Sequence, residues 1–249
     1  MLLAEMTWPR VAALSKHTPV VLPLAALEQH GEHLPVFTDS MLVGEITRRA
    51  ERELAGRILL APVMWLGNSA HHLDFAGTMS AAPRTYIDLV GDMVENFLVH
   101  GFKRIVLVNG HGGNNVPGEQ AVFECRQRHR DKNDLLLLFA CYWAIGTGEK
   151  SEPEFEQTAM GHACEWETSM ILALRPELVG DYAVVKDVSA QGAFDPARRA
   201  WTTKDRSSAG HIGVPRAASA EKGRKLLDRF SGDLVRLLAR VVEWDGRSF

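Results

Sequence analysis

Residues 20–35 read VVLPLAALEQHGEHLP, an apolar run that passes directly into acidic and histidine side chains. The apolar part, Val20 to Leu27, predicts a buried strand. Glu28 and His30 follow it, and side chains two apart on an extended chain point the same way, so both can reach one point. Carboxylate oxygen and neutral imidazole nitrogen are ligands that Zn, Mn and Fe accept. Taken alone, the pair also fits a polar surface loop, so the interpretation depends on the rest of the chain.

Three further apolar runs predict strands, and segments with helical spacing lie between them. The strands are expected at 58–66, 105–109 and 135–143. Helices are expected after Thr38-Asp39-Ser40, after Pro83, from Pro117 and, as a long closing helix, over 226–241. Alternating strands and helices predict an α/β fold, with a mainly parallel central sheet between two layers of helices.

Composition and charge fit one globular domain over residues 1–249, with 46% apolar residues. A net charge of −3 without charge blocks predicts neither nucleic acid nor an anionic membrane as partner. Glu5 and Arg10 interrupt any signal-peptide pattern, and the apolar run 135–145 is too short to span a bilayer. Scattered cysteines predict reduced thiols in a cytoplasmic protein: Cys125, Cys141 and Cys164.

Chemically reactive side chains follow three of the predicted strands. In an open parallel sheet, ligands bind outside the carboxyl ends of the strands. One rule of the fold therefore brings these segments to one edge of the sheet, and the first turn of a later helix adds another. The segments are 28–39, 67–78, 109–115 and 161–169.

The segment Asn109-Gly110-His111-Gly112-Gly113-Asn114-Asn115 has two interpretations. A glycine-rich turn between strand and helix can cradle a phosphate through its backbone amides. The segment has neither the dinucleotide-binding nor the P-loop spacing, however. The glycines beside His111 also permit a tight turn that presents its imidazole. We favour metal ligation by His111 over phosphate binding.

Glu28, His30, Asp39 and His111, with one more acid, supply enough ligands for two divalent ions (Zn, Mn or Fe). Asp39 is expected to bridge the ions, because it follows the Glu/His pair by a turn and begins a helix. Glu165, in the first turn of a helix, is expected to be the fifth ligand and to take part in catalysis. Such a pair of ions can hold a hydroxide that attacks an amide carbonyl.

His162 is predicted to act as general acid or base and to protonate a leaving nitrogen; a capping or core histidine is the alternative. Other candidates are expected to contact the substrate or to orient the ligands. For these the alternative is a place in the core, on the surface or in a surface salt bridge. They are His72, Asn114, Trp143, Trp166 and Glu167. The irregular stretch 180–213 is expected to form a lid, a hairpin or a subunit contact.

Taken together, these motifs resemble the creatininase (creatinine amidohydrolase) family, in the subgroup with an Asn-Gly-His-Gly-Gly-Asn motif. The resemblance implies a three-layer domain with a dinuclear metal site, usually assembled as a homohexamer, that hydrolyses C–N bonds in cyclic or linear amides. It also implies that Glu28, His30, Asp39 and His111 are ligands and that His162 is catalytic. The matching segments are Leu22-Pro23-Leu24, 28–39, 75–78, 109–114, 161–169 and 213–223.

Two departures from the family pattern point away from creatinine as substrate. Enzymes that act on creatinine carry a ligand glutamate where this chain has Gly113, and Glu165 is expected to take its place. They also have tryptophan and glutamate where this chain has residues 158–161. We therefore predict a hydrolase of another small amide. A peptidase or a formamide deformylase on the same site is an alternative, and a non-catalytic metal- or nucleotide-binding module is another.

Overall fold

The apolar runs form the centre of a three-layer arrangement. The computed structural model describes residues 1–146, 154–189, 194, 197 and 199–249. Its strands are all parallel, in the order β2-β1-β3-β4: β1 (Val20–Leu24), β2 (Leu59–Leu60), β3 (Arg104–Asn109) and β4 (Leu136–Cys141). The expected α/β fold with a parallel central sheet is confirmed.

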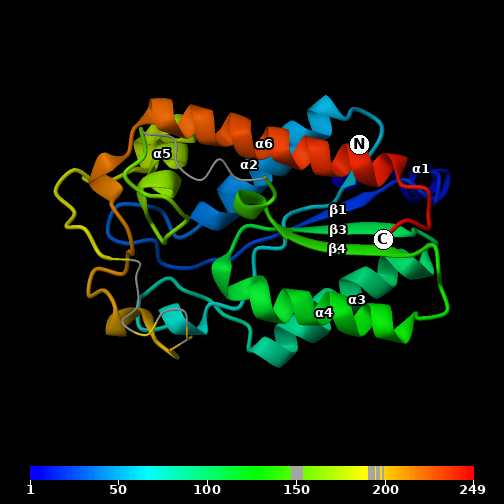
Figure 1. Ribbon diagram of the computed structural model, residues 1–249, viewed down its shortest axis with the longest axis horizontal. Coiled ribbons are helices and arrows are strands. Elements are labelled where there is room, and N and C mark those ends of the chain that lie inside the picture. The colour runs from blue at the N-terminus through cyan, green and yellow to red at the C-terminus, as the bar shows by residue number, and fades with distance from the viewer. Residues whose placement is uncertain (147–153, 190–193, 195–196, 198) are drawn as a thin grey trace.

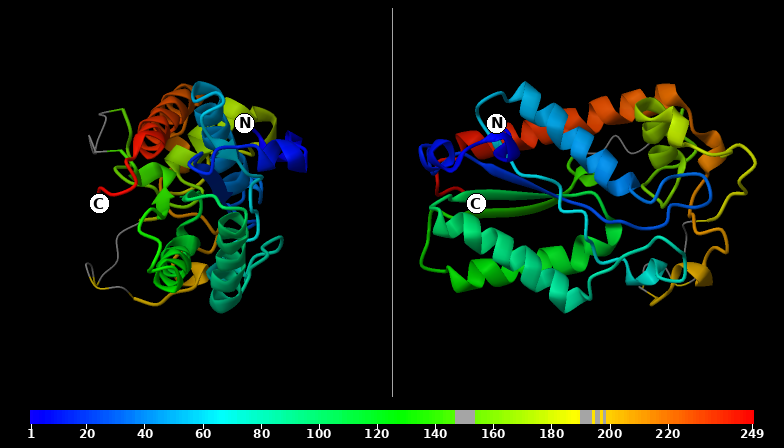
Figure 2. Two further views of the ribbon diagram at one scale, coloured as in Figure 1. Left: turned by 90° about the vertical axis from the view of Figure 1, so that its right-hand side faces the viewer. Right: turned by 180° about the vertical axis from the view of Figure 1, so that it is seen from behind.

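Helices cover both faces of the sheet (Figure 1). On one face lie α2 (Thr38–Glu53), α5 (Glu165–Leu174) and α6 (Ala220–Glu243), and on the other lie α3 (Pro83–Val99) and α4 (Asn115–Arg128). The turned views show the same three layers, with the short α1 (Trp8–Ala12) beside the N-terminus (Figure 2).

Alternation along β1 divides its side chains between two apolar cores. Val21 belongs to the core under α2 and α6, whereas Val20 and Leu22 belong to the core under α3. Each fully buried side chain of this kind contributes about 1.5–3 kcal/mol of transfer free energy. In the register of the sheet, Leu24 pairs with Asn109, so β1 and β3 end at the same level. The segments that begin at Glu28 and His111 therefore leave the sheet side by side.

Three predicted strands are longer than the observed ones. The first ends at Leu24 rather than Leu27. The second, expected over 58–66, forms ladder pairs only at Leu59–Leu60, and its pairing with β1 returns as an isolated bridge between Met64 and Leu24. The fourth, expected over 135–143, ends at Cys141 and is followed by a 3-10 turn, Tyr142–Ala144. As an edge strand, it is also half-buried rather than covered on both faces.

The stretch 180–213 includes residues outside the described ones (190–193, 195–196 and 198). In its described part, Val188 and Gly213 form an isolated antiparallel bridge, and Thr203–Asp205 form a 3-10 turn. The three cysteines are free, as expected. Among the described helices, none combines the length and the hydropathy that a membrane span requires.

Candidate metal centre

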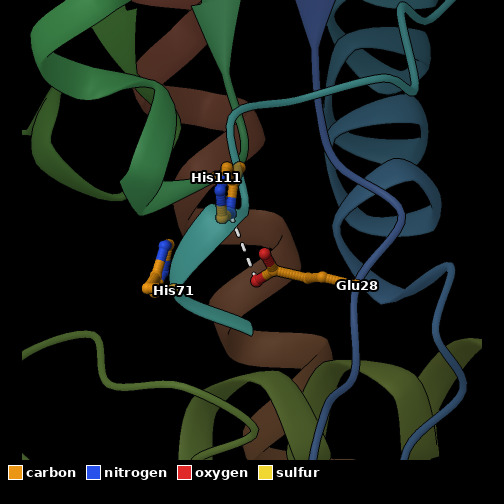
Figure 3. Close-up of side chains that lie close together, drawn as sticks. All are labelled: Glu28, His71 and His111. Carbon is orange, nitrogen blue, oxygen red and sulfur yellow. Dashed lines mark ion pairs between the residues drawn. The ribbon is translucent and has the colours of Figure 1, made fainter. Parts of the chain in front are cut away.

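Four of the five predicted ligands meet at the carboxyl edge of the sheet. Glu28 and His30 follow β1, Asp39 lies in the first turn of α2, and His111 follows β3. All four side chains are buried. Glu28 and His111 point toward each other from neighbouring strands, with His71 from the intervening segment beside them (Figure 3). The structure thus brings together residues that are up to 83 positions apart in the chain (111 − 28).

Glu28, Asp39 and His111 form the first half of the site. The Nδ1 of His111 lies 3.2 Å from Glu28 Oε1 and 3.1 Å from Asp39 Oδ2. Its Nε2 lies 3.0 Å from the carbonyl oxygen of Asn68, which can only accept. The hydrogen of the neutral ring therefore sits on Nε2, and the lone pair of Nδ1 faces the two carboxylates.

His30, Asp39 and Glu167 form the second half. The Nε2 of His30 lies 3.1 Å from Asp39 Oδ1 and 3.8 Å from Glu167 Oε1. The Nδ1 of His30 donates to the backbone oxygen of Glu28 at 3.1 Å, which fixes the ring and turns Nε2 inward. Asp39 thus offers one carboxylate oxygen to each half, as expected of a bridging ligand.

Several oxygen atoms of this cluster are buried without a hydrogen-bond partner: both carboxylate oxygens of Glu28, Oδ2 of Asp39 and Oε2 of Glu167. Leaving a buried carboxylate without compensation is costly. Groups of His and acidic side chains here have ligand atoms close enough to one another to hold a metal ion. The donor set, carboxylate and imidazole, fits a borderline divalent ion.

The pKa values of the cluster follow from its charges. Burial raises the pKa of Glu28. Burial alone would lower the pKa of His30 and His111, but the neighbouring carboxylates outweigh it and raise both pKa values well above the usual range. The carboxylates therefore favour a positive charge beside these two imidazoles. A divalent ion would supply that charge in place of a proton.

His162 lies over the cluster, at the cavity side. Its Nδ1 is 3.5 Å from Glu28 Oε1, and its Nε2 is 2.8 Å from the backbone oxygen of Gln29. Its ring packs against those of His72 and His30, with centroids 4.2 and 4.4 Å away. Burial, together with these imidazoles, lowers the pKa of His162 well below its usual value. A neutral imidazole in this position can accept a proton.

Glu165 lies outside the cluster, contrary to the expectation that it is the fifth ligand. Its Oε1 pairs with Lys222 Nζ at 2.5 Å, and its Oε2 accepts the amide of Gln157 at 2.8 Å. Side chains two apart in a helix point in different directions, so Glu165 and Glu167 cannot face the same point. The carboxylate that faces His30 belongs to Glu167, which was expected only to orient a ligand.

The remaining candidates divide between cavity and interior. His72 and Trp143 line a cavity of about 860 Å³ that also reaches Glu28, Asp39 and His111. Trp166 does not line it, and packs instead against Phe155 and Phe230 in the core. Asn114 is fully buried and holds the segments in place, because it accepts from the amide of Asn68 and donates to the oxygen of Ala25.

The sequence analysis gave no role to Gln29, which lies between the candidate ligands Glu28 and His30. Its Nε2 is 2.7 Å from His72 Nδ1 and 2.9 Å from the oxygen of Gly210. It therefore joins three segments around the site. The backbone at Ala163 was also unforeseen, with φ at +48°, a region that L-residues with a Cβ seldom adopt. The position of Gln29 inside the Glu-Gln-His motif could have indicated its role. Nothing in the sequence indicates the strained backbone at Ala163.

Position 113 has no room for a side chain. A Cβ there would overlap the carbonyl oxygen of Asn68 and the Nε2 of His111. We expect Gly113→Ala to displace His111 and weaken metal binding about 10- to 100-fold, the range found when a group that orients a ligand is lost. Gly112→Ala is the matched control, because a Cβ there meets no atom within 4 Å. Equal metal affinities of the two variants, measured by competition with a chelator, would contradict this.

Comparison with known proteins identifies the family of this arrangement. The family described as "Creatinine amidohydrolase" (Creatininase) matches residues 4–238. The mycofactocin precursor peptide peptidase of Mycobacterium ulcerans (strain Agy99) is 30% identical over 96% of this chain and 86% of that protein. Creatinine amidohydrolase of Pseudomonas putida is 29% identical over 90% of each.

Solved structures of creatininases are similar to this chain as well. A mutant creatininase of the Zn–Zn type superimposes with a TM-score of 0.83 at 25% identity, over 96% of this chain and 97% of that one. A creatininase structure named for Mn is also similar. The match extends over the sheet and both helical layers, so it includes the edge at which the acidic and histidine side chains meet.

Proposed function

The chain belongs to the creatininase family, whose members are hydrolases, and we propose that it is a metal-dependent amidohydrolase that cleaves a C–N bond in a small cyclic or linear amide. We further propose two divalent ions (Zn, Mn or Fe) per chain. One would be held by Glu28, Asp39 and His111, and the other by Asp39, His30 and Glu167.

The observation that carries the proposal is the set of buried carboxylate oxygens without hydrogen-bond donors at Glu28, Asp39 and Glu167. Their nearest neighbours are imidazole nitrogens whose other nitrogen is already engaged with a backbone oxygen. Three buried acids and two oriented imidazoles make a binding site for cations rather than a packed core.

Ions bound there would lower the pKa of water and polarise a carbonyl oxygen. The protein supplies the remaining chemistry. His162 stands between the cluster and the cavity, neutral and with Nδ1 directed at the site, so it is placed to accept a proton from water and to deliver it to the leaving nitrogen. The backbone oxygen of Gln29 lies 2.8 Å from His162 Nε2 and orients the ring, and Trp143 lines the cavity with an apolar surface.

Metal analysis and chelation test the proposed function. We expect about two divalent ions per purified chain, hydrolysis of at least one member of a panel of cyclic amides, formamides and short peptides, and loss of that activity in chelator. Readdition of Zn²⁺ or Mn²⁺ should restore it. A chain that binds no divalent ion, or that hydrolyses its substrate at full rate in chelator, would refute the proposal.

His162→Ala should separate chemistry from metal binding. We expect kcat to fall by about 10²- to 10⁴-fold, the usual contribution of a general acid or base, while metal content stays near that of the unaltered protein. His100→Ala, at the exposed end of α3, is the control and should change neither quantity. Undiminished kcat in His162→Ala would remove this residue from the mechanism.

A peptidase is the second candidate function, and the similarity to a peptide peptidase favours it. The cavity of about 860 Å³ lies at the upper end of the range for small-molecule sites, so it has room for a short peptide. The peptide arm of the panel distinguishes the two candidates. The family is hydrolytic, which argues against a non-catalytic module.

We also propose that the chain belongs to the subgroup with the Asn-Gly-His-Gly-Gly-Asn motif, and that it forms a homohexamer in the cytoplasm. The lack of space at position 113 supports the first point, since a glutamate ligand cannot fit there. Exposed apolar side chains at Trp8, Val116 and Phe123 support an oligomer, and the free cysteines suit a reducing compartment.

A further inference from the structure

One wall of the cavity carries arginines that the proposed reaction does not use. The segment 199–206, called the wall, contributes Arg199, Ala200, Trp201 and Arg206 to the lining of the cavity that also reaches Glu28 and Asp39. A substrate whose amide reaches the proposed metal ligands would therefore lie in the same cavity as two guanidinium groups.

Contacts with the active-site histidines hold this wall in place. Thr203 is fully buried, and its hydroxyl lies 2.8 Å from His72 Nδ1. The ring of Trp201 stands edge-on to that of His71, with centroids 5.1 Å apart. His71 in turn stacks on His111. The wall is thus joined to the metal centre by packed side chains.

Arg206 is held by contacts with its neighbours. The guanidinium carbon of Arg206 lies 5.0 Å from the centre of the Trp201 ring, and its Nη2 donates to the oxygen of Ser189 at 3.3 Å. A guanidinium stacked on an indole keeps its planar fork oriented and can still bind a further acceptor. Arg199 is exposed at the cavity rim.

The charged residues that line the cavity fall into two groups. The acidic ones are Glu28, Asp39 and Glu167, all in the proposed metal cluster, where two divalent ions would neutralise them. The basic ones are Arg199 and Arg206 of the wall. Asp205, also in the wall, caps a turn by accepting the amide of Thr202 at 2.7 Å. Among the described residues, the charged side chains that line the cavity outside the cluster are therefore the two arginines.

We propose that Arg206 and Arg199 bind an anionic group, a carboxylate or a phosphate, carried by the amide substrate at the end away from the scissile bond. This inference rests on the proposed function and names its substrate class. Guanidinium forks match the geometry of both anions, and charge-assisted hydrogen bonds of this kind are stronger than neutral ones. The Trp201 ring offers a flat surface to the part of the substrate between the two ends.

Paired probes test the proposal by calorimetry on metal-loaded His162→Ala protein, in which turnover is expected to be slow. One pair is N-formylglycine and N-formylglycinamide, and the other is N-formyl-O-phosphoethanolamine and N-formylethanolamine. We expect at least one anionic probe to bind about tenfold or more tightly than its neutral partner. The pair that shows the preference distinguishes a carboxylate from a phosphate substrate.

In the same His162→Ala protein, a second substitution, Arg206→Gln or Arg199→Gln, should reduce the preference for the anionic probe. Arg57→Gln, on the surface beside Glu243, is the control and should leave that preference unchanged. Arg199 is exposed, so its variant remains informative if Arg206→Gln does not fold. Equal binding within both pairs would overturn the proposal, as would a preference that survives both substitutions, because the metals alone would then explain it. Lack of bound metal, or of hydrolysis of any amide, would instead count against the proposed function.

Discussion

Asp39→Asn is expected to lower kcat/KM by about a thousandfold or more and to reduce metal content below one ion per chain. Asparagine keeps the shape of the side chain but offers only one oxygen and no charge. Asp39 directs Oδ1 toward His30 and Oδ2 toward His111, so one substitution affects both halves of the site. Loss of about 4 kcal/mol of electrostatic stabilisation corresponds to a thousandfold in rate.

Asp233→Asn is the matched control, because Asp233 is also a buried carboxylate but pairs with Arg236 on α6. It should retain both ions and nearly full kcat/KM. Steady-state kinetics and metal analysis of the two purified variants check the pair. If Asp39→Asn kept two ions per chain, a bridging role for this residue would be ruled out.

Glu167→Gln and Glu165→Gln are expected to have different effects, although the two residues lie only two positions apart, on either side of Trp166. Glu167→Gln should lose the ion beside His30 and reduce kcat/KM by about 100-fold or more, with little change in Tm. Glu165→Gln should retain two ions but unfold at a lower temperature, because it leaves Lys222, mostly buried, without its carboxylate.

Breaking a buried ion pair costs about 3 kcal/mol, which lowers Tm by roughly 6–12 °C in a chain of this size. Lys222→Met tests the same pair from the other side and should also lower Tm while leaving the metal content intact. Calorimetry and metal analysis measure both quantities. A loss of metal in Glu165→Gln, with two ions retained in Glu167→Gln, would restore the original sequence-based assignment of Glu165.

Spacing in the sequence was enough to predict the sheet and the meeting of four candidate ligands. The continuous apolar runs at 20–24 and 105–109 form buried parallel strands, and the rule that ligands gather at carboxyl strand ends correctly placed Glu28, His30 and His111 in one cluster. Strand ends were less predictable. Beyond Leu60 the apolar character continues, but the regular ladder gives way to an isolated bridge at Met64.

The choice between Glu165 and Glu167 could not be made from the sequence. Both lie in the first turn of α5, and only the rotation of that helix determines which carboxylate faces His30. That rotation depends on Lys222 in α6 and on Gln157, residues that are distant in the sequence. For the same reason Trp166 was expected at the cavity but packs against Phe230.

Anomalous diffraction from crystals grown with Zn²⁺ tests the central claim most directly. Our account predicts two peaks, about 3.5–4 Å apart as in other two-metal sites, with Asp39 between them. Glu28 and His111 should coordinate one ion, and His30 and Glu167 the other. A single peak, or two peaks of which neither contacts Asp39, would contradict it.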